Sequence, residues 1–244
     1  MKFSRYKHDL DYSYAFGATL CYELYKTDPK RIQRVYLRPS EKYGADLQAL
    51  VADLEAHKIE VLVSGKPFNI LGAKDSCLVI TEFKKGAKPR LADQKPHLVL
   101  VNPSDAGNLG TIMRSAAAFN FTNIAIIDPA TDEYNPKAVR ASMGAIFHLN
   151  VKHYASFKEY QDAFPDYANY AFMLDKHSQQ VSDIILHRPS RDNFSLIFGN
   201  EASGLPQNFA DICTPVILRQ SKLVDSLNLS TAASIAMYLF TLED

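Results

Sequence analysis

Short apolar runs alternate with amphipathic segments along the second half of the chain. The apolar runs predict strands at residues 97–101, 123–127, 148–151, 170–174, 194–198 and 215–218. Apolar positions at helical spacing predict helices at residues 109–119 and 136–143 and a final helix over about 227–242. Strands that alternate with helices predict an α/β domain with a mainly parallel sheet.

The first half has a similar but smaller pattern. We expect helices at residues 12–24 and 46–57 and strands at 34–37, 60–63 and 77–81, which together indicate a small α/β domain. Residues 84–96 are charged, contain Gly86 and two prolines and lack apolar periodicity, so they predict an interdomain linker. The predicted organisation is therefore a domain at residues 1–83, a linker at 84–96 and a domain at 97–244.

Charge separates the two halves. Formal net charge is 0, with 27 Lys+Arg and 27 Asp+Glu in 244 residues. Residues 1–95 hold 17 basic and 12 acidic residues (17 − 12 = +5), which leaves 10 and 15 (10 − 15 = −5) for residues 96–244. This asymmetry is consistent with an anion-binding N-terminal module, although a similar surplus is common on surfaces that bind nothing.

Composition excludes several classes of protein. The hydrophobic fraction of 47% is sufficient for a packed core, and no run reaches the roughly 18 apolar residues of a membrane span, so we expect a cytoplasmic protein. Cys21, Cys77 and Cys213 are far apart and unpaired in spacing, which argues against a disulfide framework or a zinc site. The tyrosines near the N-terminus could stack on nucleobases or pack a small core.

The stretch 195–205 is the first candidate for chemistry. An apolar run ends at Gly199, the carboxylate of Glu201 follows, Gly204 is a second permissive position, and Pro206 suits the first turn of a helix. Ligands of open α/β sheets bind beyond the carboxyl ends of strands, where such a loop would lie. The alternative is an ordinary turn with a solvated Glu201.

Two other stretches have similar character. Residues 102–114 leave a strand, pass a Gly-containing loop and enter a helix, where Arg114 could hold a phosphate or a ribose hydroxyl or could pair with Asp105. Residues 225–233 place a polar cluster at the start of the final helix, and Asp225 or Ser226 could be no more than its cap.

The order and spacing of the three stretches resemble the motifs of the SpoU family, also called TrmH, of RNA 2′-O-ribose methyltransferases in the SPOUT superfamily. Residues 102–114 match the first motif, 196–205 the second and 218–233 the third, and residues 135–144 match a further family segment. The resemblance covers residues 97–242, while residues 1–83 loosely resemble the L30e-like RNA-binding domain that often precedes the methyltransferase domain. Ala106, Asn120 and residues 218–220 depart from the family pattern.

The resemblance implies a SPOUT α/β domain with a deep C-terminal trefoil knot, S-adenosylmethionine as cofactor, a homodimer and an RNA substrate, either ribosomal or transfer RNA. Of these two we expect ribosomal RNA. Under the resemblance the cofactor is lined by Gly199, Leu218, Gln220 and Leu227. The reaction site it implies consists of Arg114, Asn108, Glu201, Ser226 and Asn228, without a metal. Our hypothesis is that Arg114 positions the ribose and assists its deprotonation, and that Glu201 fixes Arg114 or the loop geometry.

Three other functions compete with this interpretation. A non-catalytic RNA-binding protein on the same fold need not keep Asn108, Arg114, Glu201 and Asn228 together. A dinucleotide-dependent oxidoreductase would need a Gly-x-Gly-x-x-Gly motif, and the chain contains no Gly-x-Gly. A serine hydrolase at Ser203 would lack the leading glycine of the nucleophile elbow.

Overall fold

The computed structural model describes residues 3–87, 90–187, 192–221 and 223–242. Contacts divide the chain into two compact units. The first unit comprises Met1–Ala87 and Asp132–His148, and the second comprises Lys88–Thr131 and Leu149–Asp244. The division falls inside the predicted linker, and it differs from the predicted domains in assigning residues 132–148 to the first unit.

The first unit is built on a four-stranded sheet in the order β1-β4-β2-β3. Strands β1 and β4 are antiparallel, as are β2 and β4, whereas β2 and β3 are parallel. Its elements are β1 (Tyr12–Phe16), α1 (Ala18–Thr27), η1 (Pro29–Arg31), β2 (Ile32–Leu37), α2 (Ala45–Ala56), β3 (Val61–Val63), α3 (Lys66–Leu71), β4 (Val79–Lys84), α5 (Pro136–Ala141) and η2 (Ala145–His148).

One prediction for the first unit is wrong. Residues 12–16 form the strand β1, not the start of a helix, and Gly17, with a φ of 102°, separates this strand from α1. The aromatic side chains of Tyr12, Tyr14 and Phe16 recur at the period of two that is typical of a strand. Tyr14 and Tyr36 are buried in an aromatic core cluster, so these two tyrosines pack the unit.

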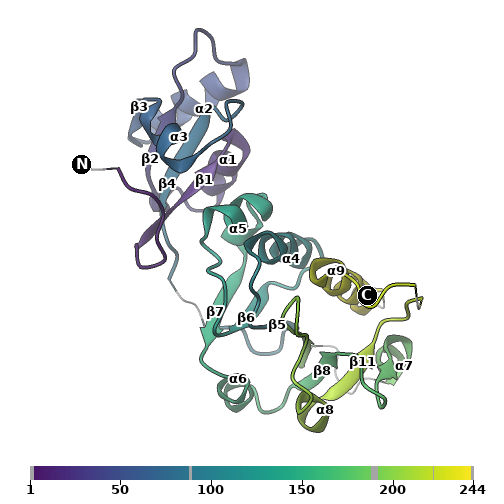
Figure 1. Cartoon of the computed structure of the whole chain (residues 1–244). Helices are drawn as coiled ribbons and strands as arrows, with labels where there is room; N and C mark the ends of the chain where they lie inside the picture. The colour runs from purple at the N-terminus through teal and green to yellow at the C-terminus, as the bar shows by residue number, and fades with distance from the viewer. Residues whose placement is uncertain (1–2, 88–89, 188–191, 222, 243–244) are drawn as a thin grey trace. The chain divides into compact units, whose positions relative to one another are not determined.

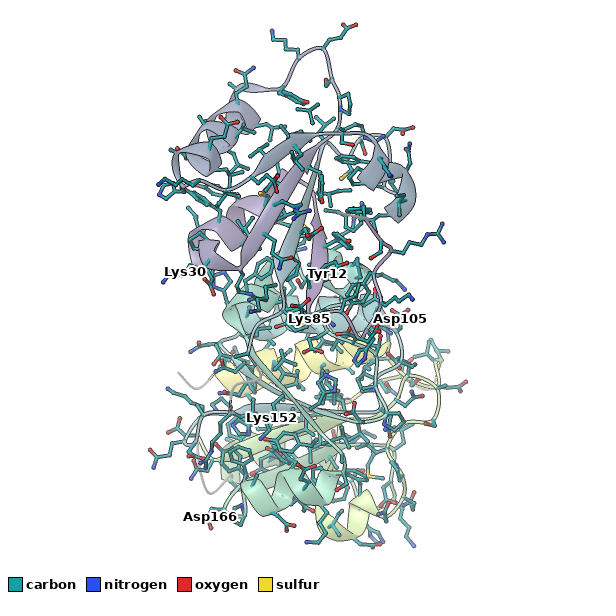
Figure 2. The ribbon with its side chains drawn as sticks, turned by 90° about the vertical axis from the view of Figure 1, so that its left-hand side faces the viewer. Tyr12, Lys30, Lys85, Asp105, Lys152 and Asp166 are labelled. Atoms are coloured by element: carbon teal, nitrogen blue, oxygen red, sulfur yellow. The ribbon has the colours of Figure 1, made fainter. Side chains whose placement is uncertain are left out.

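The segment Asp132–His148 is held to the first unit by aromatic and polar contacts. The guanidinium of Arg31 lies 5.5 to 5.8 Å from the ring centroids of Phe83, Tyr134 and Phe147. Lys85, which is labelled in Figure 2, has its Nζ atom 3.4 Å from the Asp132 carboxylate. These contacts explain why a segment that follows β6 in sequence packs with residues from the N-terminal region.

The second unit contains a seven-stranded sheet in the order β7-β6-β5-β10-β8-β11-β9, and each neighbouring pair of strands is parallel. The strands are β5 (His97–Val101), β6 (Asn123–Ile127), β7 (Asn150–Tyr154), β8 (Ala168–Phe172), β9 (Gln179–Gln180), β10 (Phe194–Phe198) and β11 (Thr214–Ile217). The helices are α4 (Ala106–Ala118), α6 (Phe157–Ala163), α7 (Val181–His187), α8 (Phe209–Ile212) and α9 (Leu229–Thr241).

Helices cover both faces of this sheet. In Figure 1, α4 and α9 lie side by side on one face, and α6 and α8 lie on the other. The second face is lined by alternate strand residues such as Val99, Ala125 and Ile197, which pack against Phe157 of α6 and Phe209 of α8. The α/β fold with a mainly parallel sheet is therefore as predicted. The short helices α6 and α7 and the strand β9 were not predicted, because each is too short to display a clear period.

The backbone at Asn120, the three cysteines and the length of the helices also bear on expectations from the sequence. At Asn120 the resemblance leads us to expect glycine, and the φ of 60° at this residue is a left-handed conformation that Asn tolerates better than most residues. Cys21 is buried and Cys77 and Cys213 are partly buried, and all three thiols are free. Within the described ranges, no helix has the length and apolar character needed to cross a membrane.

Candidate functional site

The three candidate motifs meet at the carboxyl edge of the sheet in the second unit. β5 and β10 are parallel neighbours, with Leu100 in register with Phe198. The loops that follow these two strands, residues 102–105 and 199–204, therefore leave the sheet side by side. The segment after β11, residues 218–228, leaves the same edge, because β11 and β10 both pair in parallel with β8. This is the edge at which ligands of open α/β sheets bind.

A cavity of about 490 Å³ opens between these loops. Its walls include Phe172, Phe198, Gly199, Glu201, Leu218, Gln220, Ser226 and Leu227. All four residues predicted for the cofactor, Gly199, Leu218, Gln220 and Leu227, are among them. Phe172 and Phe198 stack with their ring centroids 4.6 Å apart, and sequence analysis did not select this aromatic pair.

The loop after β10 requires glycine at position 199. Asn200 and Gly204 form a small antiparallel bridge, with N···O distances of 3.2 and 2.9 Å. A Cβ atom on Gly199 would lie 2.2, 2.3 and 2.4 Å from backbone atoms of Gly204 and Leu205, which is closer than real Cβ atoms approach. The loop can therefore close on itself only when residue 199 has no side chain.

Glu201 joins this loop to the loop after β5. Its carboxylate accepts hydrogen bonds from the Ser104 backbone N–H at 3.0 Å, the Ser104 hydroxyl at 2.7 Å and the Asp105 N–H at 3.1 Å. Burial of the carboxylate raises the pKa of Glu201, but the hydrogen bonds from Ser104 and Asp105 outweigh burial and lower this pKa below its usual value. Glu201 is therefore a carboxylate that fixes two loops.

Asn108 and Asn228 extend this network to the third motif. The Asn108 side-chain amide donates to Glu201 at 3.4 Å, and the Asn108 oxygen accepts from the side-chain amide of Asn228 at 3.2 Å. Asn228 is also the N-cap of α9, since its oxygen accepts from the Ser230 N–H at 2.9 Å. The cap of α9 is thus Asn228, not Ser226 or Asp225, because the helix begins at Leu229, two positions later than predicted.

Arg114 and Ser226 lie outside this hydrogen-bond network. α4 begins at Ala106 and not at Leu109, with Asp105 (labelled in Figure 2) as its cap, so Arg114 lies deeper in the helix than expected. Arg114 is exposed, and no hydrogen bond or ion pair joins it to another residue of the described ranges. Of the two uses suggested for Glu201, the contacts match loop geometry and not a bond to Arg114. Ser226 is exposed at the wall of the cavity.

Two residues that sequence analysis did not select complete the connection between the loops. The Asn200 side-chain amide donates to the Asn102 carbonyl at 2.8 Å, and its oxygen accepts from the Ala202 N–H at 2.9 Å. Ser104 supplies two of the donors to Glu201. The position of Asn200 between Gly199 and Glu201 was the available signal, because a short amide side chain in a tight loop commonly binds the nearby backbone.

Comparison with known proteins identifies the family of this chain. The model of the SpoU rRNA Methylase family matches residues 95–238. The chain belongs to the SpoU rRNA Methylase family. The matched region contains all three motifs and every wall residue of the cavity named above.

Individual relatives differ in how much of the chain they cover. A 23S rRNA (guanosine(2553)-2′-O)-methyltransferase of Bacillus subtilis is 27% identical over 209 residues, 79% of this chain and 77% of that protein. A Bacillus subtilis protein provisionally named tRNA (cytidine(34)-2′-O)-methyltransferase is 33% identical over 149 residues, 58% of this chain and 89% of its own. Two other curated relatives are matched over only 26% and 51% of their length.

A solved structure has the same fold over nearly the whole chain. The SpoU methyltransferase AviRb of Streptomyces viridochromogenes, in complex with the cofactor AdoMet, has a TM-score of 0.79 and 19% identity. The similarity covers 96% of this chain and 90% of that one. At this identity the similarity establishes the fold.

The described parts of the chain contain no group of three or more His, Cys, Asp or Glu side chains arranged to hold a metal ion.

Proposed function

We propose that this chain transfers a methyl group from S-adenosylmethionine to a ribose 2′-hydroxyl of structured RNA. The observation that carries the proposal is the junction of three motifs at one edge of the sheet. There the cavity of about 490 Å³ adjoins the polar chain that runs from Ser104 through Glu201 and Asn108 to Asn228. Family membership supports this chemistry over the oxidoreductase and hydrolase alternatives.

The cavity has the size and chemistry for the cofactor. Its volume lies within the roughly 300–1,000 Å³ of ordinary ligand pockets. The stacked rings of Phe172 and Phe198 and the side chains of Leu218 and Leu227 offer apolar contact, and the loops at Gly199 and Gln220 offer backbone donors and acceptors. When bound, the sulfonium of S-adenosylmethionine supplies an electrophilic methyl group.

The residues of this chain then have to orient and activate the ribose. Holding the reacting atoms in line can contribute roughly 7–11 kcal/mol. A hydroxyl is a weak nucleophile until its proton leaves. In our proposal Arg114 positions the ribose and its phosphate, because its exposed guanidinium is not committed to a protein partner. The guanidinium stays charged, so it assists deprotonation by stabilising the developing negative charge on the ribose oxygen while the proton passes to water. Asn108, Ser226 and Asn228 orient the hydroxyl and the surrounding loops.

Glu201 has a positioning role in this proposal. Its oxygens already accept from Ser104, Asp105 and Asn108, so removing a substrate proton would require these bonds to break. The lowered pKa of Glu201 also makes it a poor proton acceptor. Its contribution is to keep the loops after β5 and β10 in register.

The RNA substrate and the assembly belong to the same proposal. We favour ribosomal RNA over transfer RNA because the relative that matches 79% of this chain is named as a 23S rRNA enzyme. The first unit would act as the L30e-like RNA-binding domain, and the C-terminal segment of the second unit would form the trefoil knot. A homodimer is supported by exposed apolar side chains at Ile235 and Tyr238 of α9 and at Leu242, the C-cap of this helix. Light scattering of the purified chain tests the dimer.

Transfer of labelled methyl from S-adenosylmethionine to unmodified ribosomal and transfer RNA tests the activity. We expect label in one RNA class, resistant to alkaline cleavage at the modified nucleotide, and a loss of at least about 100-fold in kcat for Arg114→Ala, within the range of positioned proton-transfer groups. Arg90→Ala is the matched control, because Arg90 has an exposed surface ion pair with Asp93. Near-wild-type turnover of Arg114→Ala with intact cofactor binding would refute the role of Arg114.

A further inference from the structure

A second cavity lies within the first unit. It is lined by Phe16, Gly17, Lys74, Ser76, Cys77 and Arg140, and its volume is about 170 Å³. This is smaller than the roughly 300–1,000 Å³ of pockets that enclose whole drug-sized ligands. The cavity is therefore suited to one small group, and its chemistry indicates which.

Two cations and a hydroxyl face this cavity without a protein partner. Lys74, Arg140 and Ser76 are exposed, and the described residues provide no hydrogen bond or ion pair for their side-chain polar atoms. None of the six lining residues is acidic. The adjacent Asp75 is fully exposed and lies 3.5 Å from Arg38 Nη1, so its carboxylate already has a partner.

The loop that carries Lys74 and Ser76 has a fixed shape. Arg38 donates to the backbone carbonyls of Cys77 at 3.0 Å, Ala73 at 3.3 Å and Lys74 at 3.2 Å. The Arg38 guanidinium also lies 4.5 Å from the centroid of the Phe68 ring. Arg38 thus holds the backbone of residues 73–77, and the side chain of Lys74 starts from a defined position.

The second cation comes from a distant part of the sequence. Arg140 is in α5, within the segment Asp132–His148 that packs in the first unit. Arg38 and Arg140 both act electrostatically on the partly buried thiol of Cys77. Burial raises the pKa of Cys77, while Arg38 and Arg140 act in the opposite direction. The cavity is thus a positively charged recess between two segments.

We propose that this Lys74–Arg140 cavity binds a phosphate group of the RNA backbone. A guanidinium offers a planar pair of donors to phosphate oxygens, and an ammonium adds a point charge. A hydroxyl such as that of Ser76 commonly donates to the same group. The assignment to RNA rests on the proposed function, and it adds a substrate contact formed by residues of the first unit alone.

Paired double variants test this inference in the full-length chain. Lys74→Gln/Arg140→Gln removes the two cations of the cavity, and Lys30→Gln/Lys42→Gln removes two exposed cations elsewhere in the first unit. Lys30 is visible at the outer edge of the first unit in Figure 2. Binding of a fluorescent RNA hairpin is followed by anisotropy at several KCl concentrations, and inorganic phosphate is titrated by calorimetry.

We expect the cavity variant to bind the hairpin roughly tenfold more weakly, with the slope of log K against log salt concentration reduced by about 1. The control should change affinity less than about threefold, and both variants should keep wild-type affinity for S-adenosylmethionine. Equal losses in the two double variants would overturn the inference, since they would reflect overall charge. Phosphate binding at this cavity with unchanged RNA affinity would also overturn it, because the site would serve the free anion.

The methyl-transfer assay separates this inference from the proposed function. If wild-type protein methylates RNA and the cavity variant has an unchanged KM for RNA, the phosphate site is refuted and the proposed function stands. If wild-type protein transfers no methyl group while the cavity variant alone loses affinity for the hairpin, the proposed function is refuted and the phosphate site stands.

Discussion

Replacement of Gly199 by alanine is the sharpest perturbation of the cofactor site. The new Cβ would lie 2.2, 2.3 and 2.4 Å from backbone atoms of Gly204 and Leu205, whereas ordinary contact begins near 3.4 Å. The two sides of the loop would have to separate by about 1 Å, which breaks both hydrogen bonds of the Asn200–Gly204 bridge. Each such bond contributes about 0.5–1.5 kcal/mol net, so closing the loop becomes less favourable by roughly 1–3 kcal/mol.

This free energy converts directly to cofactor affinity if binding needs the closed loop. We expect Gly199→Ala to bind S-adenosylmethionine about 5- to 150-fold more weakly in isothermal titration calorimetry. Gly44→Ala is the matched control, because a Cβ at Gly44 meets no atom within 4 Å. Urea unfolding of both variants distinguishes a local effect from global destabilisation. Wild-type affinity in a folded Gly199→Ala protein would refute the link between the closed loop and the cofactor.

Two further predictions concern stability. Burial lowers the pKa of His97 to about 4 in the folded protein, whereas the ordinary pKa of about 6.5 applies to the unfolded chain. As the pH falls from about 7 to about 5, His97 is therefore protonated in the unfolded chain but not in the folded one. This difference should lower the unfolding free energy by about 2 kcal/mol. Urea unfolding of the wild type and of His97→Gln measures this, and an equal pH dependence in the two proteins would contradict it. Asn228→Ala should lower the unfolding free energy by about 1 kcal/mol through loss of the α9 cap, whereas Asn228→Asp should keep the cap and lose only the bond to Asn108. Equal thermal stability of the two Asn228 variants would be evidence against the cap.

The buried strands were the most predictable part of the fold. β5, β6 and β10 occur at the predicted residues because each contains a mainly apolar run buried on both faces of a parallel sheet. Residues 12–16 were misassigned because the alternating tyrosines run directly into the apolar start of α1, and the break depends on the backbone conformation of Gly17. A single sequence carries little information about such a break.

The candidate site was likewise predictable only in part. Gly199, Leu218, Gln220 and Leu227 were selected as one group, and they do line one cavity. The contacts of Glu201 with Ser104 and Asp105 could not be derived, because they depend on β5 and β10 being neighbours although they are far apart in sequence. The roles of Asn108, Glu201, Ser226 and Asn228 in the reaction remain predictions, and the Arg114→Ala variant tests the role of Arg114.

Because Asp132–His148 belongs to the first unit, the chain cannot be divided into its two units by a single cut. The polypeptide passes between the units at residues 87–88, 131–132 and 148–149, so neither unit is encoded by one uninterrupted stretch. A fragment that starts at residue 97 would carry Tyr134 and Phe147 without Phe83 and Arg31, the groups that cover them. A fragment of that kind would therefore expose these two aromatic rings to solvent.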